Sequence, residues 1–363
     1  MITTRAPGKL FIAGEYAVVD PGQPAVLIAV DRYITVQVTE SSGAGHVYSR
    51  EYGGLPLVWT RHQDSVGIML EHNPYDYVVA AISIVERLRA QRGLTPRYFD
   101  LLIESELDDA DGRKFGLGSS AAVVVATVAA LDEFYGLELT RVERFKLALL
   151  ATVQVAPSAS GGDIAASTFG GWIRYTAPNR ASLLRYLDQH GVAATLESDV
   201  WSPCSVTRLP APSTLRLLVG WTGSPASTER LVDGVRPHDD TEGRHYGAFL
   251  EESRSCVDDL VAAFTEDEEQ RALEVVRRAR RMLRRLGSSS GTQIETKKLR
   301  ILCDSAEENG AAAKPSGAGG GDCGIVLAGT EVSSDALLRT WEHHDIRLLR
   351  VNVHPAEGGI FDI

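Results

Sequence analysis

Residues 114–122 combine the residue types of an anion-binding loop. They read Lys-Phe-Gly-Leu-Gly-Ser-Ser-Ala-Ala, and the apolar run of residues 123–131 follows directly. Glycine permits backbone conformations that other residues avoid. A glycine turn that leads into a helix also aims free N–H groups and the positive end of the helix dipole at an anion. We therefore expect this loop to hold the phosphates of a nucleotide. The expected nucleotide-binding residues are Gly116, Leu117, Gly118, Ser119, Ser120 and Ala121.

Other interpretations of the same loop remain open at this point. The loop lacks the Gly-Lys-Ser/Thr ending of a Walker loop, but it fits the dinucleotide-binding pattern G-x-G-x-x-A. That pattern requires glycines directly after a strand, whereas the charged residues 107–114 separate Gly116 from the predicted strand of residues 99–106. An ordinary surface loop with a serine N-cap is the simplest alternative.

Lysine is placed selectively in this chain. Only six of the 37 basic residues are lysine, and Lys9, Lys114 and Lys314 each lie beside a glycine-containing segment. An ammonium group is a compact, rotatable charge that suits a phosphate during transfer. This placement predicts two phosphate-bearing ligands in one cleft.

Three further segments could contribute to a site. Residues 157–167 are mostly small, and Ser160 and Asp163 are spaced like a capping box. Asp163 could equally face a ligand from the start of the same helix. Residues 221–228 form a hydroxyl-rich loop that could donate to an anion or lie on the surface. The glycine-rich residues 314–324 lead into a predicted strand, which favours close approach to a ligand over a flexible linker.

Hydrophobic periodicity and turn residues predict alternating strands and helices. Residues 180–200 read as a variable connection and a candidate domain boundary. The predicted strands comprise residues 10–12, 26–30, 33–38, a hairpin over 47–60 with Gly53-Gly54 at its tip, 99–106, 170–175, 215–220, 325–328 and 348–353. The predicted helices comprise residues 75–92 after Asn73-Pro74, 119–135, a helix from Thr140 to before Pro157, 266–286 capped by Gly287, and 293–309.

Composition restricts the class of protein. A length of 363 residues favours two domains, and a net charge of −11 argues against nucleic acid as the main partner. The arginine-rich face of residues 266–286 is therefore expected to be solvated. Four scattered cysteines predict reduced thiols in the cytoplasm. We expect neither a signal peptide nor a membrane span, because no apolar run reaches the necessary length.

Three ordered segments resemble the signature motifs of the GHMP kinases, a family that includes galactokinase, homoserine kinase, mevalonate kinase and phosphomevalonate kinase. They are residues 7–19, 116–122 and 316–324. Residues 14–19, Lys114-Phe115, 220–224 and 294–296 resemble the phosphomevalonate kinases most closely. The resemblance implies an α+β fold of two domains with the active site in the interdomain cleft. We expect a nucleotide-binding domain over residues 1–185 and a C-terminal domain over residues 186–363.

The resemblance also implies a reaction, namely transfer of the ATP γ-phosphoryl group to 5-phosphomevalonate. It assigns Mg²⁺ to Ser119 or Ser120, and catalytic roles to Lys9 and Asp163. We also expect a catalytic role for Lys114, which with Lys9 would neutralise the converging phosphates. The expected substrate-binding residues are Tyr16, Ser158, Ser160, Gly161, Thr222, Lys314, Ser316 and Gly317. The alternatives are a sibling kinase such as mevalonate kinase, in which Asp163 would act as a base on an alcohol, and a non-catalytic member of the fold. The sequence does not predict an oligomeric state.

Overall fold

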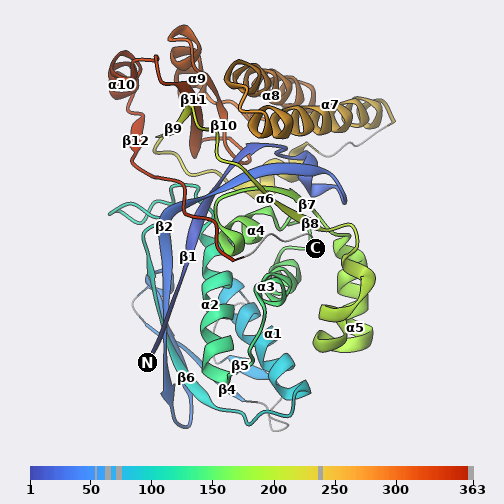
Figure 1. Cartoon of the computed structure of the whole chain (residues 1–363). Helices are drawn as coiled ribbons and strands as arrows, with labels where there is room; N and C mark the ends of the chain where they lie inside the picture. Colours follow the sequence, from blue (N-terminus) through green and yellow to red (C-terminus); the bar gives the residue numbers. More distant parts are fainter. Residues whose placement is uncertain (54, 62–66, 71–75, 236–239, 359–363) are drawn as a thin grey trace.

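The computed structural model describes residues 1–53, 55–61, 67–70, 76–235 and 240–358, without the side chains of residues 240–242. Two sheets, each with its own helices, form two domains that are stacked one above the other (Figure 1). The expected two-domain α+β fold is confirmed. No described helix combines the length and apolar character needed to cross a bilayer.

The first sheet is built around two long strands. β1 (Ile2–Ala13) and β2 (Pro24–Ser41) pair antiparallel, and each is longer than the short strands that the sequence predicted. The strand order is β5-β4-β3-β6-β2-β7-β8, with β1 paired to β2. The other strands are β3 (Gly45–Tyr48), β4 (Leu57–Arg61), β5 (Ile68–Leu70), β6 (Tyr98–Ser105), β7 (Trp172–Thr176) and β8 (Ser205–Leu209).

Four helices that precede residue 170 pack with this sheet around one apolar core (Figure 1). They are α1 (Tyr77–Gln91), α2 (Ser119–Tyr135), α3 (Arg141–Val155) and α4 (Gly162–Phe169). α2 has the predicted bounds and ends at Gly136 in the left-handed conformation. α3 begins after a complete capping box between Thr140 and Glu143. The predicted Asn73-Pro74 stop and Gly54 lie outside the described residues.

The prediction of a variable connection over residues 180–200 is wrong. Most of this segment is α5 (Arg180–Glu197), which packs on the first domain. Gly191 interrupts the helical conformation with φ 78°, so the segment lacks a single amphipathic period that the sequence could reveal. β8 then pairs with β7 in the first sheet. A division after residue 185 would split this unit, and we propose a division between Leu209 and Leu215 instead.

The second domain contains a four-stranded sheet in the order β10-β11-β9-β12. Its strands are β9 (Leu215–Trp221), β10 (Ala312–Pro315), β11 (Cys323–Gly329) and β12 (Arg347–Leu349), and its helices are α6 (Thr228–Gly234), α7 (Asp240–Thr265), α8 (Glu269–Ser290), α9 (Lys297–Glu308) and α10 (Ser334–His343). The predicted cap at Gly287 is wrong, because α8 continues to a left-handed Gly291. A Cβ on Gly287 would lie 2.7 Å from the Thr292 carbonyl oxygen, so this glycine permits close packing.

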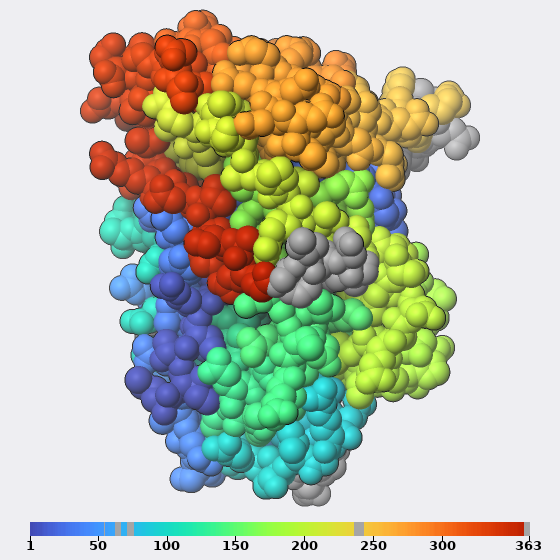
Figure 2. All heavy atoms as spheres, viewed as in Figure 1, coloured from blue at the N-terminus to red at the C-terminus, as the bar shows by residue number. Residues whose placement is uncertain are grey.

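After β12 the chain returns to the first domain as a strap, defined here as residues 351–358 (Figures 1 and 2). Val353 forms a β-bridge with Val30. The His354 carbonyl oxygen accepts from the Gly171 N–H, and the Glu357 N–H donates to the last residue of α4, Phe169. The predicted strand of residues 348–353 is therefore split between the two domains.

Candidate active site

The predicted motifs enclose a cavity of about 300 Å³ between the two domains. The first domain contributes β1 and the starts of α2 and α4, and the second contributes residues 225–232 and part of the glycine-rich loop. The predicted site residues that line the cavity are Lys9, Tyr16, Lys114, Gly116, Gly118, Ser119, Ser120, Ala121, Ser158, Ser160, Gly161, Asp163, Ser316 and Gly317.

The glycine turn before α2 has the expected geometry. Gly116 and Gly118 have φ values of 81° and 80°, which glycine adopts without strain. Gly118 is the N-cap of α2 and has no side chain to cap it, so the serine N-cap interpretation is wrong. Ser119 and Ser120 form the first turn and face the cavity. The helix start is therefore open to an anionic ligand.

Lys9 joins the first strand to this turn. Its backbone N–H donates to the carbonyl oxygen of Leu117 over 2.8 Å. The Leu117 side chain, predicted to bind nucleotide, is instead buried outside the cavity lining. A Cβ on Gly118 would lie 2.7 Å from Lys9 Cε. The absence of a side chain at Gly118 therefore leaves room for the Lys9 side chain beside the turn.

Asp163 faces Lys9 across the cavity. Asp163 Oδ2 lies 3.4 Å from Lys9 Nζ, and the carboxylate keeps about a third of its surface exposed (34%). The capping-box interpretation is wrong, because Gly161 is the N-cap of α4 and Ser160 Oγ accepts from the Gly162 N–H. Asp163 is therefore held in the first turn of α4 and directed at a cation rather than at its own backbone.

Lys114 lies at the mouth of the cavity, where it is half-exposed. Lys114 ends a small loop that is closed by backbone contacts. Asp108 and Lys114 form an isolated antiparallel β-bridge, and the Phe115 N–H donates to the Leu107 carbonyl oxygen. Lys114 Nζ lies 2.6 Å from Glu51 Oε1, and both side chains are mostly exposed. An exposed ion pair of this kind contributes little to stability and is easily exchanged for a ligand.

The structure contradicts the predicted ligand contacts of Lys314 and Thr222, because both side chains are buried outside the cavity lining. Lys314, on β10, forms an ion pair with Glu15 and donates to the Pro315 carbonyl oxygen. Thr222 donates its backbone N–H to the Asp322 carbonyl oxygen. These two residues support the cavity wall from behind.

Tyr16 and Ser316 line the cavity with their polar groups already engaged. Tyr16 has φ 63° and ψ −55°, and the Ala17 N–H donates to Glu15, which together define a strained γ-turn. The Tyr16 hydroxyl donates to the Ala318 carbonyl oxygen, and burial raises the pKa of this hydroxyl. Ser316 Oγ donates to the Phe11 carbonyl oxygen and accepts from the Phe11 N–H, which joins the third motif to β1.

The lining also contains charged or polar residues that were not among the predicted site residues, namely Glu15, Tyr77, Thr152, Thr228, Glu229 and Asp322. Glu15 is buried, and Asp322 is partly buried. Burial raises the pKa of the Asp322 carboxyl, while the Ala226 N–H and Lys9 act to lower it. An acid directly after a run of three glycines was the available signal for Asp322.

The cavity offers oxygen ligands that suit Mg²⁺. Ser119, Ser120 and the carboxylates of Glu15, Asp163 and Asp322 line it. Within the described ranges, no group of three or more His, Cys, Asp or Glu residues could enclose a metal. Mg²⁺ commonly takes one or two protein ligands and completes its shell with substrate phosphates and water. The residues present fit that mode of binding.

Comparisons with known proteins agree with this geometry. Residues 76–171 match the model for the GHMP kinases N terminal domain, and residues 261–346 match that for the GHMP kinases C terminal region. A phosphomevalonate kinase of Streptomyces sp. (strain CL190) is 46% identical over 374 residues, covering 99% of this chain and 98% of the relative. A mevalonate kinase of Thermococcus sibiricus is 28% identical over 342 residues, covering 90% and 89%.

A solved structure is similar over nearly the same extent. It is Streptococcus pneumoniae phosphomevalonate kinase in complex with phosphomevalonate and AMPPNP, with a TM-score of 0.84 and 29% identity. The match covers 97% of this chain and 100% of the solved chain. Both family models and a full-length relative at 46% identity therefore agree on one assignment, and the chain belongs to the GHMP kinases.

Proposed function

We propose that this chain transfers the γ-phosphoryl group of ATP to 5-phosphomevalonate and releases 5-diphosphomevalonate and ADP. The higher identity to a phosphomevalonate kinase (46%) than to a mevalonate kinase (28%) supports this acceptor. The complex of the Streptococcus pneumoniae enzyme with phosphomevalonate and AMPPNP supports ATP as the donor.

The observation that carries the proposal is the position of Lys9. Its ammonium group lies 3.4 Å from Asp163, and its side chain passes Gly118 at the start of α2. A γ-phosphate held by the free N–H groups of α2 and a phosphate acceptor held near α4 would meet on either side of this charge. Phosphoryl transfer depends mainly on such positioning and charge neutralisation.

A phosphate acceptor explains why positive charge matters more than a base. The second pKa of a phosphomonoester is about 6, so the acceptor is mostly a dianion near pH 7. The barrier then includes the repulsion of two anions, which Lys9 at the centre and Lys114 at the mouth would reduce. Ser158, Ser160 and Gly161 line the cavity beside Asp163 and are proposed to bind acceptor oxygens.

Mg²⁺ would be held by Ser119 or Ser120 together with phosphate oxygens. When bound, it would neutralise the β- and γ-phosphates. The four cysteines are free and buried, which supports a reducing compartment, and we propose the cytoplasm.

A parallel assay tests the proposal. Purified protein with ATP and Mg²⁺ is given mevalonate, phosphomevalonate or diphosphomevalonate, and ADP release is measured. We expect rapid turnover of phosphomevalonate and nearly none of the other two. Faster turnover of mevalonate would assign the chain to the sibling kinase, in which Asp163 would act as a base on an alcohol. No turnover with any acceptor would favour the non-catalytic alternative.

A further inference from the structure

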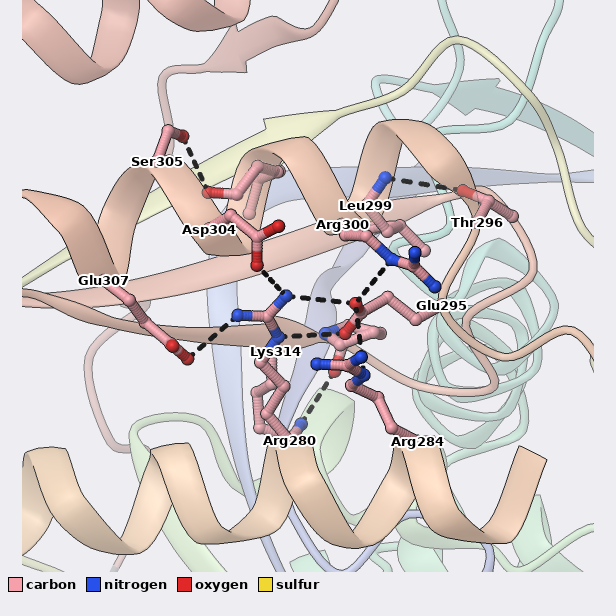
Figure 3. A network of polar contacts seen from close by, with 12 residues as sticks. Arg280, Arg284, Glu295, Thr296, Leu299, Arg300, Asp304, Ser305, Glu307 and Lys314 are labelled. Atoms are coloured by element: carbon pink, nitrogen blue, oxygen red, sulfur yellow. Dashed lines mark hydrogen bonds and ion pairs between the residues drawn. The ribbon is translucent and has the colours of Figure 1, made fainter. Parts of the chain in front are cut away.

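A buried carboxylate in the second domain is surrounded by arginines. Glu295, in the loop between α8 and α9, accepts two hydrogen bonds from Arg280 over 2.9 and 3.0 Å, and both side chains are almost fully buried. Arg284 and Arg300 lie 3.8 and 3.7 Å from the same carboxylate. Figure 3 shows the arginines converging on Glu295 from α8 and α9. A buried ion pair with this geometry fixes the position of the loop that carries it.

Arg280 is itself fully engaged. Asp304 and Glu307, on α9, lie 2.5 and 3.0 Å from its guanidinium group (Figure 3). Burial alone would lower the pKa of Arg280, but the hydrogen bond to Glu295 and the surrounding anions raise it overall. Arg280 therefore stays charged and joins α8, the Glu295 loop and α9 at one point.

The residue before Glu295 contacts the third motif. The Ile294 carbonyl oxygen accepts from the Gly320 N–H over 2.8 Å. A Cβ on Gly319 would lie 2.3 Å from that same oxygen, so the two backbones are in close contact. The Ile294 side chain is buried in a cluster that also contains Tyr16. The position of the Glu295 loop therefore determines where the glycine-rich loop can lie.

The glycine-rich loop needs such support. Gly319, Gly320 and Gly321 have φ values of 66°, 72° and 159°, so three consecutive residues lie in conformations open mainly to glycine. Glycine loses more conformational entropy on ordering than any other residue. The loop nevertheless lines the cavity with residues on both sides of these glycines, from Ser316 to Asp322.

We propose that Arg280 and Glu295 are positioning residues for the reaction, which hold the glycine-rich loop against the cavity through the Ile294 carbonyl group. Neither residue lines the cavity. They act through the backbone of residues 294 and 320. The catalytic part of this inference rests on the proposed function, whereas the ordering of the loop does not.

Glu295→Gln tests the inference, because it keeps the shape and removes the charge. Hydrogen exchange is followed in the peptide covering residues 316–324, and kcat/KM is measured with phosphomevalonate. We expect exchange in this peptide to accelerate about tenfold, which corresponds to the loss of one hydrogen bond. We expect kcat/KM to fall about 10- to 100-fold, since small displacements of positioning groups have effects of that size.

The matched control is Glu274→Gln, which removes an exposed partner of Arg281 on the same helix α8. This control should change neither readout. Arg280→Lys keeps the charge but loses the paired hydrogen bonds, and it should give an intermediate result in both. It also keeps the test available if Glu295→Gln folds poorly.

Unchanged exchange in residues 316–324 would overturn the inference. So would an acceleration spread evenly over α7, α8 and α9, because that would indicate general destabilisation of the domain. If the wild-type protein does not turn over phosphomevalonate, the proposed function fails, and the exchange measurement still decides whether the loop is held in this way.

Discussion

Two ion pairs in this molecule each join a cation to a carboxylate, but one is partly exposed to solvent and the other is buried. Lys9 and Asp163 lie 3.4 Å apart in the cavity, and the aspartate is about a third exposed. Arg280 and Glu295 lie 2.9 Å apart with side chains only 3% and 4% exposed, and further carboxylates complete the shell of the arginine. In the first pair, Lys9 can exchange Asp163 for an anionic ligand at a small cost in free energy. In the second pair, Arg280 cannot exchange Glu295 for a ligand, because both side chains are buried.

The difference separates a charge that we propose for the reaction, on Lys9, from a charge that maintains the shape of the domain, on Arg280. A loosely paired ammonium group beside free helix N–H groups can still stabilise a developing anion. A buried guanidinium group already held by three carboxylates has no such capacity, but its loss leaves an uncompensated charge in the interior. Mutations of the two pairs should therefore affect different quantities.

The largest effect on stability is expected for Arg280→Met. It would leave the Glu295 carboxylate buried without its hydrogen bonds, and breaking a buried pair in this way costs about 3–5 kcal/mol. Urea unfolding measures this loss. The control Arg281→Met removes a half-exposed arginine one residue later and should change the free energy of unfolding by less than about 0.5 kcal/mol. Equal losses in the two variants would remove the distinction between the pairs.

Lys9→Met should instead reduce kcat by about 10²–10³, the usual effect of removing one electrostatic donor. Its melting temperature should stay close to that of the wild type, because Asp163 keeps contact with solvent. Steady-state kinetics with phosphomevalonate and thermal unfolding provide the two measurements. A folded variant with nearly normal kcat would show that the reaction does not need the positive charge of Lys9.

Asp163→Asn is expected to lower kcat less than Lys9→Met does. The amide keeps the shape of the side chain, and a phosphate dianion needs no base to remove a proton. The comparison uses the same assay and requires both variants to be folded by circular dichroism. If Asp163→Asn abolishes turnover while Lys9→Met is mild, base catalysis at Asp163 replaces the charge-neutralisation account.

The smallest effect concerns Glu357 in the strap. Its hydrogen bond to His354 lowers the pKa of the Glu357 carboxyl from 4.5 to about 2, with Arg141 contributing. A lowered pKa means stabilisation that is present above pH 4.5 and is lost as pH falls toward 2. The difference in unfolding free energy between wild type and Glu357→Gln should be at most about 1 kcal/mol above pH 5, because the pair is partly exposed. It should vanish at low pH. A difference that grows on acidification would contradict this sign.

The cavity-lining glycines could be predicted because their constraint is local. A turn with positive φ before an apolar helix is encoded in a few neighbouring residues, and Gly116, Gly118 and the bounds of α2 followed from them. The family resemblance added the order of the motifs. Lys9 and Asp163 were chosen for their types and positions in those motifs, and the structure places them face to face.

Other features depend on contacts between distant segments, which local patterns do not encode. Lys314 lies in a glycine-rich motif like Lys9, but β10 directs it at Glu15, almost 300 residues earlier in the chain. α5 was missed because Gly191 disrupts its periodicity. The hydrogen bond from the Gly320 N–H to the Ile294 carbonyl oxygen joins two backbones, so no pattern of side chains could predict it.

The strap also constrains the order in which the protein is completed during synthesis. Residues 351–358 follow the whole second domain in the chain, yet their backbone pairs with Gly171 and with the end of α4 in the first domain. The first domain therefore emerges from the ribosome with these contacts unmade. The helix bearing Asp163 gains these contacts only after the second domain has been translated, so the first domain cannot be completed before the second has been made.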